Sequence, residues 1–177
     1  MFLSRYFDYT KIKGQLANVI TLTNLSFGII AILLISRDLS HMSLVFIFLA
    51  ALFDRFDGMV ARHFQSESLF GKELDSLSDL ISFGVAPALL IYTTNLSNML
   101  WVGIVATIFY ILAGAVRLAR YNVREFDGTF YGVPITAAGV LLTLSYFLSH
   151  YVGPAFFVIV MIILGILMVS NIRIAKV

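Results

Sequence analysis

Residues 52–80 read LFDRFDGMVARHFQSESLFGKELDSLSDL and lie between two apolar runs. Six acidic side chains fall in this stretch, in a chain that is 60% hydrophobic and only 12% charged. Carboxylates beside a hydrocarbon phase are costly, so their concentration here indicates a functional site rather than a chance distribution. The position of these acids relative to the apolar runs decides both the fold and the chemistry.

The apolar runs on either side of this stretch belong to a pattern that covers the chain. The mean hydropathy is +0.95, and apolar runs of roughly 18 to 25 residues recur, each long enough to cross a hydrocarbon core as a helix. A soluble domain of this composition would expose too much apolar surface. The sequence therefore predicts one all-α integral membrane domain over residues 1–177, with six transmembrane helices.

The expected spans are residues 15–36, 41–62, 72–94, 98–121, 132–149 and 154–172. Residues 1–13 place Phe2, Leu3, Tyr6 and Phe7 on one helical face, which predicts a short helix in the membrane interface. A frayed terminus is the alternative for this segment. There is no cysteine, which excludes disulfides and thiolate metal sites. The net charge of +2 gives no reason to expect a nucleic-acid partner.

The basic residues predict the orientation of the chain. Eleven of the twelve Lys and Arg residues fall on one side of the expected membrane, and only Arg37 falls on the other. Because basic residues collect in cytoplasmic loops, we expect the chain in the cytoplasmic membrane with both termini in the cytoplasm. The acidic stretch lies on that same side, so the active site is expected to face the cytoplasm.

Four aspartates within the acidic stretch are spaced as two helical pairs. Asp54 and Asp57 are three residues apart near the end of the second span, and Asp75 and Asp79 are four apart at the start of the third. Each pair lies on one helical face. Since a short loop joins the two spans, the four carboxylates are expected to converge.

Converging carboxylates need a compensating cation. Oxygen ligands suit hard divalent ions such as Mg²⁺ or Mn²⁺, and a pair of such ions is common in phosphoryl chemistry. One alternative is that these are helix-end carboxylates paired with Arg55, Arg62 and Lys72. A transporter or proton channel with buried acids is another, although no internal repeat is visible and the acids lie away from mid-membrane.

The acidic stretch matches D-x2-D-G-x2-A-R-x8-G-x3-D-x3-D at every fixed position and so resembles the CDP-alcohol phosphotransferase family. The matching residues are Asp54, Asp57, Gly58, Ala61, Arg62, Gly71, Asp75 and Asp79. The resemblance implies transfer of a phosphatidyl-type group from a CDP-activated lipid to an alcohol, with release of CMP. It implies two divalent cations, Mg²⁺ or Mn²⁺, held by the four aspartates, and Asp79 as general base.

The resemblance also implies roles for the smaller residues of the motif and for the first span. Positions matching Gly58, Ala61 and Gly71 make room for the nucleotide of the CDP-lipid, and Arg62 adds charge. In the first span, ANVITLTN (17–24) is similar to the family's P-N-x-x-T segment, with Ala17 where proline is usual. This similarity gives Asn18, Thr21 and Asn24 as expected CDP-lipid contacts, with an ordinary interhelical hydrogen bond as the alternative for each.

Three further stretches resemble the phosphatidylserine synthase branch of that family: ELDSLSDLISFGVAPA (73–88), RLARYN (117–122) and FYGVPITAA (130–138). The branch implies CDP-diacylglycerol and L-serine as substrates, and the family implies a homodimer. Guanidinium groups suit the serine carboxylate. The expected serine contacts are Ser82, Arg117, Arg120 and Asn122. A glycerol-phosphate or inositol-phosphate acceptor would also need arginines, so these acceptors remain alternatives.

Overall fold

The computed structural model describes residues 9–64, 68–123 and 130–174, and it is helical there apart from one short strand pair. The elements are α1 (Tyr9–Ile35), α2 (Ser40–Phe64), α3 (Leu69–Asp79), η1 (Leu80–Val85), α4 (Ala86–Ile91), η2 (Tyr92–Leu96), α5 (Leu100–Val123), β1 (Phe130–Tyr131), α6 (Ile135–Ser145), η3 (Tyr146–Leu148), α7 (Pro154–Val169) and β2 (Arg173–Ile174). The predicted all-α fold is confirmed.

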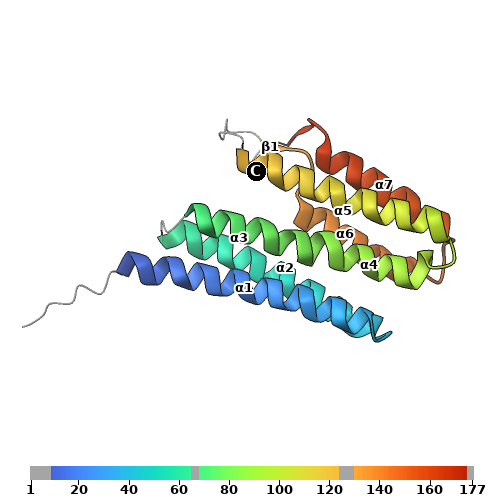
Figure 1. Cartoon of the computed structure of the whole chain (residues 1–177), viewed down its shortest axis with the longest axis horizontal. Coiled ribbons are helices and arrows are strands. Elements are labelled where there is room, and N and C mark those ends of the chain that lie inside the picture. Colours follow the sequence, from blue (N-terminus) through green and yellow to red (C-terminus); the bar gives the residue numbers. More distant parts are fainter. Residues whose placement is uncertain (1–8, 65–67, 124–129, 175–177) are drawn as a thin grey trace, which may run out of the picture.

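Consecutive elements join into longer rods. Residues 69–96 form one unbroken rod, made of α3, η1, α4 and η2 in that order. Within this rod, η1 and η2 are π-helical. In the same way, η3 extends α6 to Leu148. The described residues thus form six helical rods at the positions of the six expected spans. Figure 1 shows them lying side by side along the long axis of the molecule.

The ends of some rods differ from the expected limits. Residues 1–8 of the expected interfacial helix lie outside the described residues, and residues 9–13 already belong to α1. The start of α6 is three residues later than expected, because Gly132 has a φ of 72° and Pro134 a ψ of 141°. A side chain at Gly132 would collide with the carbonyl oxygen of Met168, so this turn requires glycine.

The C-terminal end of α7 is held by the residues that precede α6. The helix stops at Val169 because Ser170 is extended, with a ψ of 157°. The amide of Val133 donates to the carbonyl of Leu167 at 3.1 Å, and β1 pairs antiparallel with β2. The segment FYGVP therefore supplies hydrogen-bond donors to a helix end whose carbonyls have no partners within the helix.

Small and hydroxyl residues let α1 and α3 approach closely. Ser78 donates to the carbonyl of Thr21, and Ser82 donates to the carbonyl of Asn24, both at 3.2 Å. A Cβ on Gly28 would collide with the Ser82 hydroxyl and would lie 2.9 Å from its Cα. These contacts occur in the same order along both helices, so α1 and α3 run in the same direction.

The buried apolar residues form two clusters. One lies between α1, α2 and α4 and includes Ala31, Ile47 and Leu90; the larger one joins α4, α5, α6 and α7 around Tyr110 and Phe157. The outward faces of the helices are also apolar, as with Leu33, Val105 and Ile159. A membrane protein has this distribution, because lipid replaces water around it.

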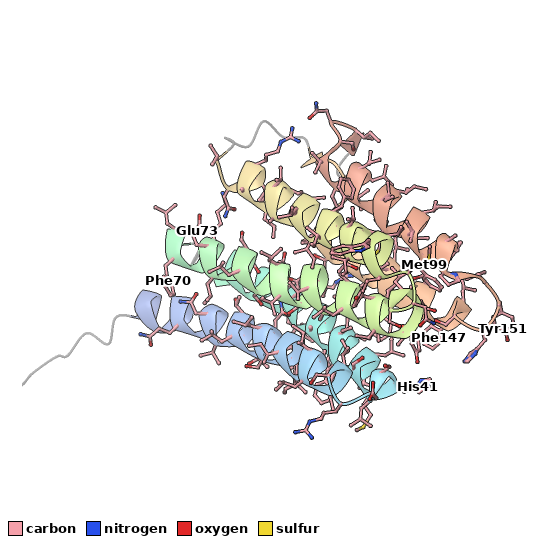
Figure 2. The ribbon with its side chains drawn as sticks, turned by 45° about the vertical axis from the view of Figure 1, so that its right-hand side comes forward. His41, Phe70, Glu73, Met99, Phe147 and Tyr151 are labelled. Carbon is pink, nitrogen blue, oxygen red and sulfur yellow. The ribbon has the colours of Figure 1, made fainter. Side chains whose placement is uncertain are left out.

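In the part of the chain that the structure describes, three helical stretches are long and apolar enough to cross a membrane: residues 18–35, 69–96 and 100–123. Residues 135–148 and 154–169 form shorter apolar helices. Figure 2 shows Phe70 and Glu73 toward one end of the bundle and Met99, Phe147 and Tyr151 toward the other. The composition and length of these helices are those of a membrane protein.

Candidate active site

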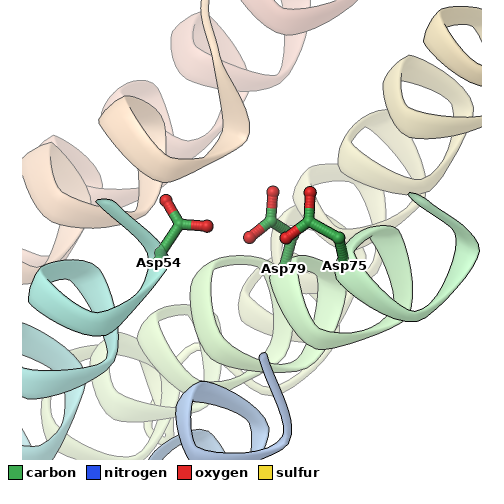
Figure 3. Close-up of side chains that lie close together, drawn as sticks. All are labelled: Asp54, Asp75 and Asp79. Atoms are coloured by element: carbon green, nitrogen blue, oxygen red, sulfur yellow. The ribbon is translucent and has the colours of Figure 1, made fainter. Parts of the chain in front are cut away.

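Three carboxylates from two helices meet near one end of the bundle. Asp54 comes from α2, and Asp75 and Asp79 come from α3; one oxygen of each lies within 4.8 Å of one oxygen of the others. The three side chains point toward one another (Figure 3). Asp79 is buried, with 8% of its surface exposed, whereas Asp54 and Asp75 are half-buried. The predicted convergence is found for these three residues.

The geometry of α2 and α3 explains this meeting. Asp75 and Asp79 are one helical turn apart, so they lie on one face of α3. The side chain of Ser68 caps α3 by accepting a hydrogen bond from the amide of Gly71 at 3.0 Å, which fixes where the helix starts. The register of α3 against α2 then brings Asp54 opposite this face.

This set of oxygens fits a hard divalent cation. An octahedral Mg²⁺ has ligand distances of about 2.0–2.1 Å, so its oxygen ligands lie about 3–4 Å from one another. The observed spread within 4.8 Å is close to that arrangement. In addition, the carboxylates of Asp54 and Asp79 approach to hydrogen-bonding distance. Two carboxylates that close repel each other unless a cation or a proton lies between them.

Arg117 brings a positive charge to the cluster from α5. Its guanidinium interacts electrostatically with the carboxylate of Asp79 and with the side chain of Tyr121. The Nε atom is buried and has no hydrogen-bond partner within the described part of the chain. A guanidinium with an unused buried donor, next to the acidic cluster, is suited to bind an anionic group there.

Arg120 and Asn122, the other residues expected on α5, have partners within the protein. The guanidinium of Arg120 donates to the carbonyl of Val169 at 2.7 Å and to the Oδ1 of Asn171 at 2.8 Å. The amide of Asn122 donates to the hydroxyl of Ser76 at 3.0 Å. Arg120 thus connects α5 to the end of α7, and Asn122 connects α5 to α3.

The three residues expected on α1 lie where α1 contacts α3 and η1; the contacts shown are the side chain of Asn18 and the backbone carbonyls of Thr21 and Asn24. Asn18 lies beside Gly71, where its Oδ1 would be 3.2 Å from an added Cβ. Thr21 is buried. Asn24 is completely buried, and neither polar atom of its side chain has a hydrogen-bond partner among the described residues. A buried amide with unmet hydrogen bonds favours a polar ligand or water beside it.

Comparison with known proteins identifies the group to which this chain is related. Residues 14–174 match the model of the CDP-alcohol phosphatidyltransferase family. The chain belongs to this family. The match covers all six helical rods, so the cluster lies inside the family domain.

Several relatives are similar over most of their length. The chain is 39% identical over 162 residues to the CDP-diacylglycerol–serine O-phosphatidyltransferase of Methanocaldococcus jannaschii, covering 91% of this chain and 74% of the relative. It is 37% identical over 156 residues to the protein of the same name from Bacillus subtilis, covering 88% and 86%. It is 36% identical over 165 residues to the archaetidylserine synthase of Methanothermobacter thermautotrophicus, covering 92% and 70%.

Three positions of the family motif lie outside the described side chains, and two glycines of the motif lie within the described residues. Asp57, Ala61 and Arg62 lie outside the residues whose side chains are described, although α2 includes all three positions. Gly58 is half-buried in the same helix. Gly71 lies at the start of α3, where Ser68 and Asn18 are its close neighbours. The roles expected for these residues stay predictions.

Thr136 was not expected near the site from the sequence, and Lys72, named as an alternative partner of the carboxylates, contacts α5. The hydroxyl of Thr136, in the first turn of α6, is a hydrogen-bonding partner of the Asp54 carboxylate. The Nζ of Lys72 donates to the carbonyl of Asn122 at 3.2 Å and lies 5.3 Å from the centre of the Tyr121 ring. Thr136 belongs to the stretch FYGVPITAA, which was the one available signal for it.

Ser82, which was expected to contact serine, has a hydrogen-bond partner within the protein. Ser82 is fully buried and donates its hydroxyl to the backbone of α1. It lies in η1, the π-helical turn that follows Asp79 directly. The structure therefore places Ser82 in the packing between α1 and the rod that carries the acidic cluster.

Proposed function

We propose that this chain transfers the phosphatidyl group of CDP-diacylglycerol to the hydroxyl of L-serine and releases CMP. The observation that carries the proposal is the convergence of Asp54, Asp75 and Asp79 from two helices. The names of the relatives at 37–39% identity support serine as acceptor and CDP-diacylglycerol as donor. The relative named archaetidylserine synthase supports serine too.

The proposed reaction is a phosphoryl-group displacement. The serine oxygen forms a bond to the lipid-bearing phosphorus, the bond between that phosphorus and the oxygen of CMP breaks, and the serine proton goes to a carboxylate. Asp79 is the proposed acceptor of the proton, because it is the most buried of the three acids and interacts with Arg117. A general base must lie within hydrogen-bonding reach of the proton that it takes.

Asp54, Asp75 and Asp79 are the proposed ligands of Mg²⁺ or Mn²⁺, and Asp57 is proposed as a fourth on the family motif. When bound, such ions offset charge on the diphosphate and on the departing CMP. Thr136 is proposed to hold the Asp54 carboxylate in the orientation that faces Asp75 and Asp79. Groups that orient metal ligands commonly affect metal affinity as well.

Arg117 is proposed to bind the serine carboxylate. It lies beside the proposed base, and its Nε has no partner in the described part of the protein. The side chains of Asn122 and Ser82 already have partners within the protein. We propose that they affect serine binding indirectly, because Asn122 holds α5 against α3 and Ser82 holds η1 against α1. Arg120, bonded to the end of α7, is proposed to fix the position of α5.

The CDP-lipid is proposed to lie along α1 and the neighbouring ends of α2 and α3. Asn18, Thr21 and Asn24 face this region from α1. Gly71, beside Asn18, and Gly58 leave room for a nucleotide because they carry no side chain. Ala61 and Arg62 are proposed to contribute by their positions in the family motif.

We also propose that all six rods cross the membrane. Since α1 and α3 run in the same direction, α2 must return between them. Lys72 at the start of α3 contacts Asn122 at the end of α5, so these two rods run in opposite directions. Arg120 near the end of α5 contacts the end of α7, so those two are parallel and α6 must return between them. The distribution of the basic residues supports the proposal that the acidic end faces the cytoplasm.

The acceptor is tested by competition. The purified protein is given CDP-diacylglycerol with equal concentrations of serine, glycerol 3-phosphate and inositol 1-phosphate, and the lipid products are separated by mass. The proposal predicts phosphatidylserine as the main product. Phosphatidylglycerol phosphate as the main product would overturn the serine assignment and retain the transferase. The homodimer implied by the family is a separate prediction, tested by the mass of the protein–detergent particle.

A further inference from the structure

The rod that carries Asp75 and Asp79 changes its helical form directly after Asp79. The six residues of η1 (Leu80–Val85) are π-helical, between the α-helical turns of α3 and α4. Single π-helical turns within α-helices are rare and occur frequently at functional sites. The conformation of η1 sets how the last turn of α3, with Asp79, lies relative to the rest of the rod.

A proline lies two residues after η1, where the amide of Ala86 donates to the carbonyl of Ile81 five residues before it. Pro87 has no amide hydrogen, so it cannot donate to the carbonyl of Phe83 four residues before it. Phe83 is completely buried. Because no water is available in an apolar interior, donors for a buried backbone carbonyl must come from the protein itself.

Tyr110 of α5 supplies a donor to this carbonyl from outside the rod. Its hydroxyl donates to the carbonyl of Phe83 at 3.1 Å, and its side chain is completely buried. Gly139 of α6 contacts the same residue, because a Cβ at this glycine would lie 2.7 Å from the oxygen and 2.8 Å from the Cα of Phe83. The backbone of η1 is thus held by α5 and α6 together.

We propose that Tyr110 is a positioning residue for Asp79. Phe83 and Asp79 are four residues apart on one continuous rod, so a shift of the Phe83 peptide moves the turn that carries the Asp79 carboxylate. Asp54 is on a different rod, and the gap between the two carboxylates therefore depends on this hydrogen bond. The inference rests on the metal-dependent transfer proposed above.

The test is Tyr110→Phe, which removes the hydroxyl and keeps the ring. Mn²⁺ binding is measured by electron paramagnetic resonance on the full chain in detergent, without substrates, and kcat and the serine KM are measured separately. We expect Mn²⁺ affinity to fall about tenfold, kcat to fall, and the serine KM to stay within about twofold. Thr107→Val is the matched control, since Thr107 is buried on the same helix and donates only to Gly103 of its own helix in the hydrogen bonds described.

A second pair of variants tests the hydrogen bond itself. Pro87→Ala restores an amide hydrogen four residues after Phe83, so Tyr110→Phe should have little effect on Mn²⁺ affinity in the Pro87→Ala background. The comparison of Pro87→Ala with the double variant also tests the inference if Tyr110→Phe alone does not fold. A tenfold loss in that background would overturn the role of the hydrogen bond.

The outcomes separate this inference from the proposed function. Tyr110→Phe could lower the melting temperature and leave Mn²⁺ affinity and kcat at their wild-type values. This result would show that Tyr110 has only a structural role, and it would overturn this inference but not the proposed function. A wild-type protein that transfers no phosphatidyl group and binds no Mn²⁺ would overturn the proposed function as well.

Discussion

At the scale of single residues, the three carboxylates and Arg117 form the chemical centre of the molecule. Asp54, Asp75 and Asp79 place like charges within 4.8 Å, and Arg117 supplies one nearby positive charge. Among the described side chains, the charge of Arg117 alone does not neutralise three carboxylates, so a further cation would stabilise them. In the proposed function, this balance of charge lets a metal and the acceptor share one site.

Arg117 gives the first prediction. Arg117→Ala should raise the serine KM, because a charge-assisted hydrogen bond to the serine carboxylate is worth about 1.5–3 kcal/mol, or about 10–150-fold. The KM for CDP-diacylglycerol should change little. Steady-state kinetics of CMP release measure both constants. Arg37→Ala is the control, because Arg37 is exposed in the turn after α1; an unchanged serine KM in Arg117→Ala would move the carboxylate site elsewhere.

Thr136 gives the second prediction. Thr136→Val removes the hydroxyl that bonds to Asp54 and preserves the shape of the side chain, so Mn²⁺ affinity should fall about 10-fold or more. Thr136→Ser retains a hydroxyl and should recover most of the affinity. Calorimetric titration with Mn²⁺ compares the two variants. Equal affinities in the valine and serine variants would refute this role.

Many of these residues could be predicted from the sequence, and others could not. Asp54, Asp75 and Asp79 follow from helical spacing and from a motif with fixed gaps. The contact between Thr136 and Asp54 could not be predicted from the sequence, because no local sequence pattern shows that α6 packs against α2. Similarly, Arg120 was expected near serine because it shares a face with Arg117, but the end of α7 supplies its partners.

At the scale of elements, the contact between α1 and the rod of α3 depends on small side chains. Gly28 lies against the backbone and hydroxyl of Ser82, whereas nothing lies within 4 Å of a Cβ added to Gly153. Gly28→Ala should therefore destabilise the protein by about 1–3 kcal/mol through overpacking. Gly153→Ala is the matched control and should change stability little. Thermal unfolding in detergent measures both, and equal melting temperatures would contradict the close packing.

Helices were predictable at this scale, whereas their irregular turns were not. Long apolar runs separated by polar turns fix six helical rods within a few residues. Pro87 marks an interruption in the third rod, but a proline does not specify that the adjustment is a π-helical turn, since a kink is equally compatible. The β1–β2 pair was not expected, because two-residue strands have no detectable periodicity.

At the scale of the whole molecule, the account predicts that the connections between rods alternate across the membrane. The chain contains no cysteine, so single cysteines report position without further changes. Ser97→Cys and Asp38→Cys, both at exposed positions, should react with a membrane-impermeant maleimide from outside intact cells, and Glu73→Cys should react only after lysis. Labelling of Glu73→Cys in intact cells, with Ser97→Cys protected, would reverse the orientation.

In the proposed function, serine and the nucleotide arrive from water, while the acyl chains remain in lipid. The outward faces of the helices are apolar, and Asp54 and Asp75 are half-buried. We therefore propose that the converging carboxylates meet both substrates at the border between lipid and water and perform metal-dependent transfer there.

The most direct test is CMP release by the purified chain with CDP-diacylglycerol and serine, measured as Mn²⁺ or Mg²⁺ is titrated. The account predicts no release without metal, saturable release with it, and loss of about 10²-fold or more in folded Asp79→Asn. Release that is independent of metal, or that persists unchanged in Asp79→Asn, would contradict the claim that these carboxylates are the catalytic centre.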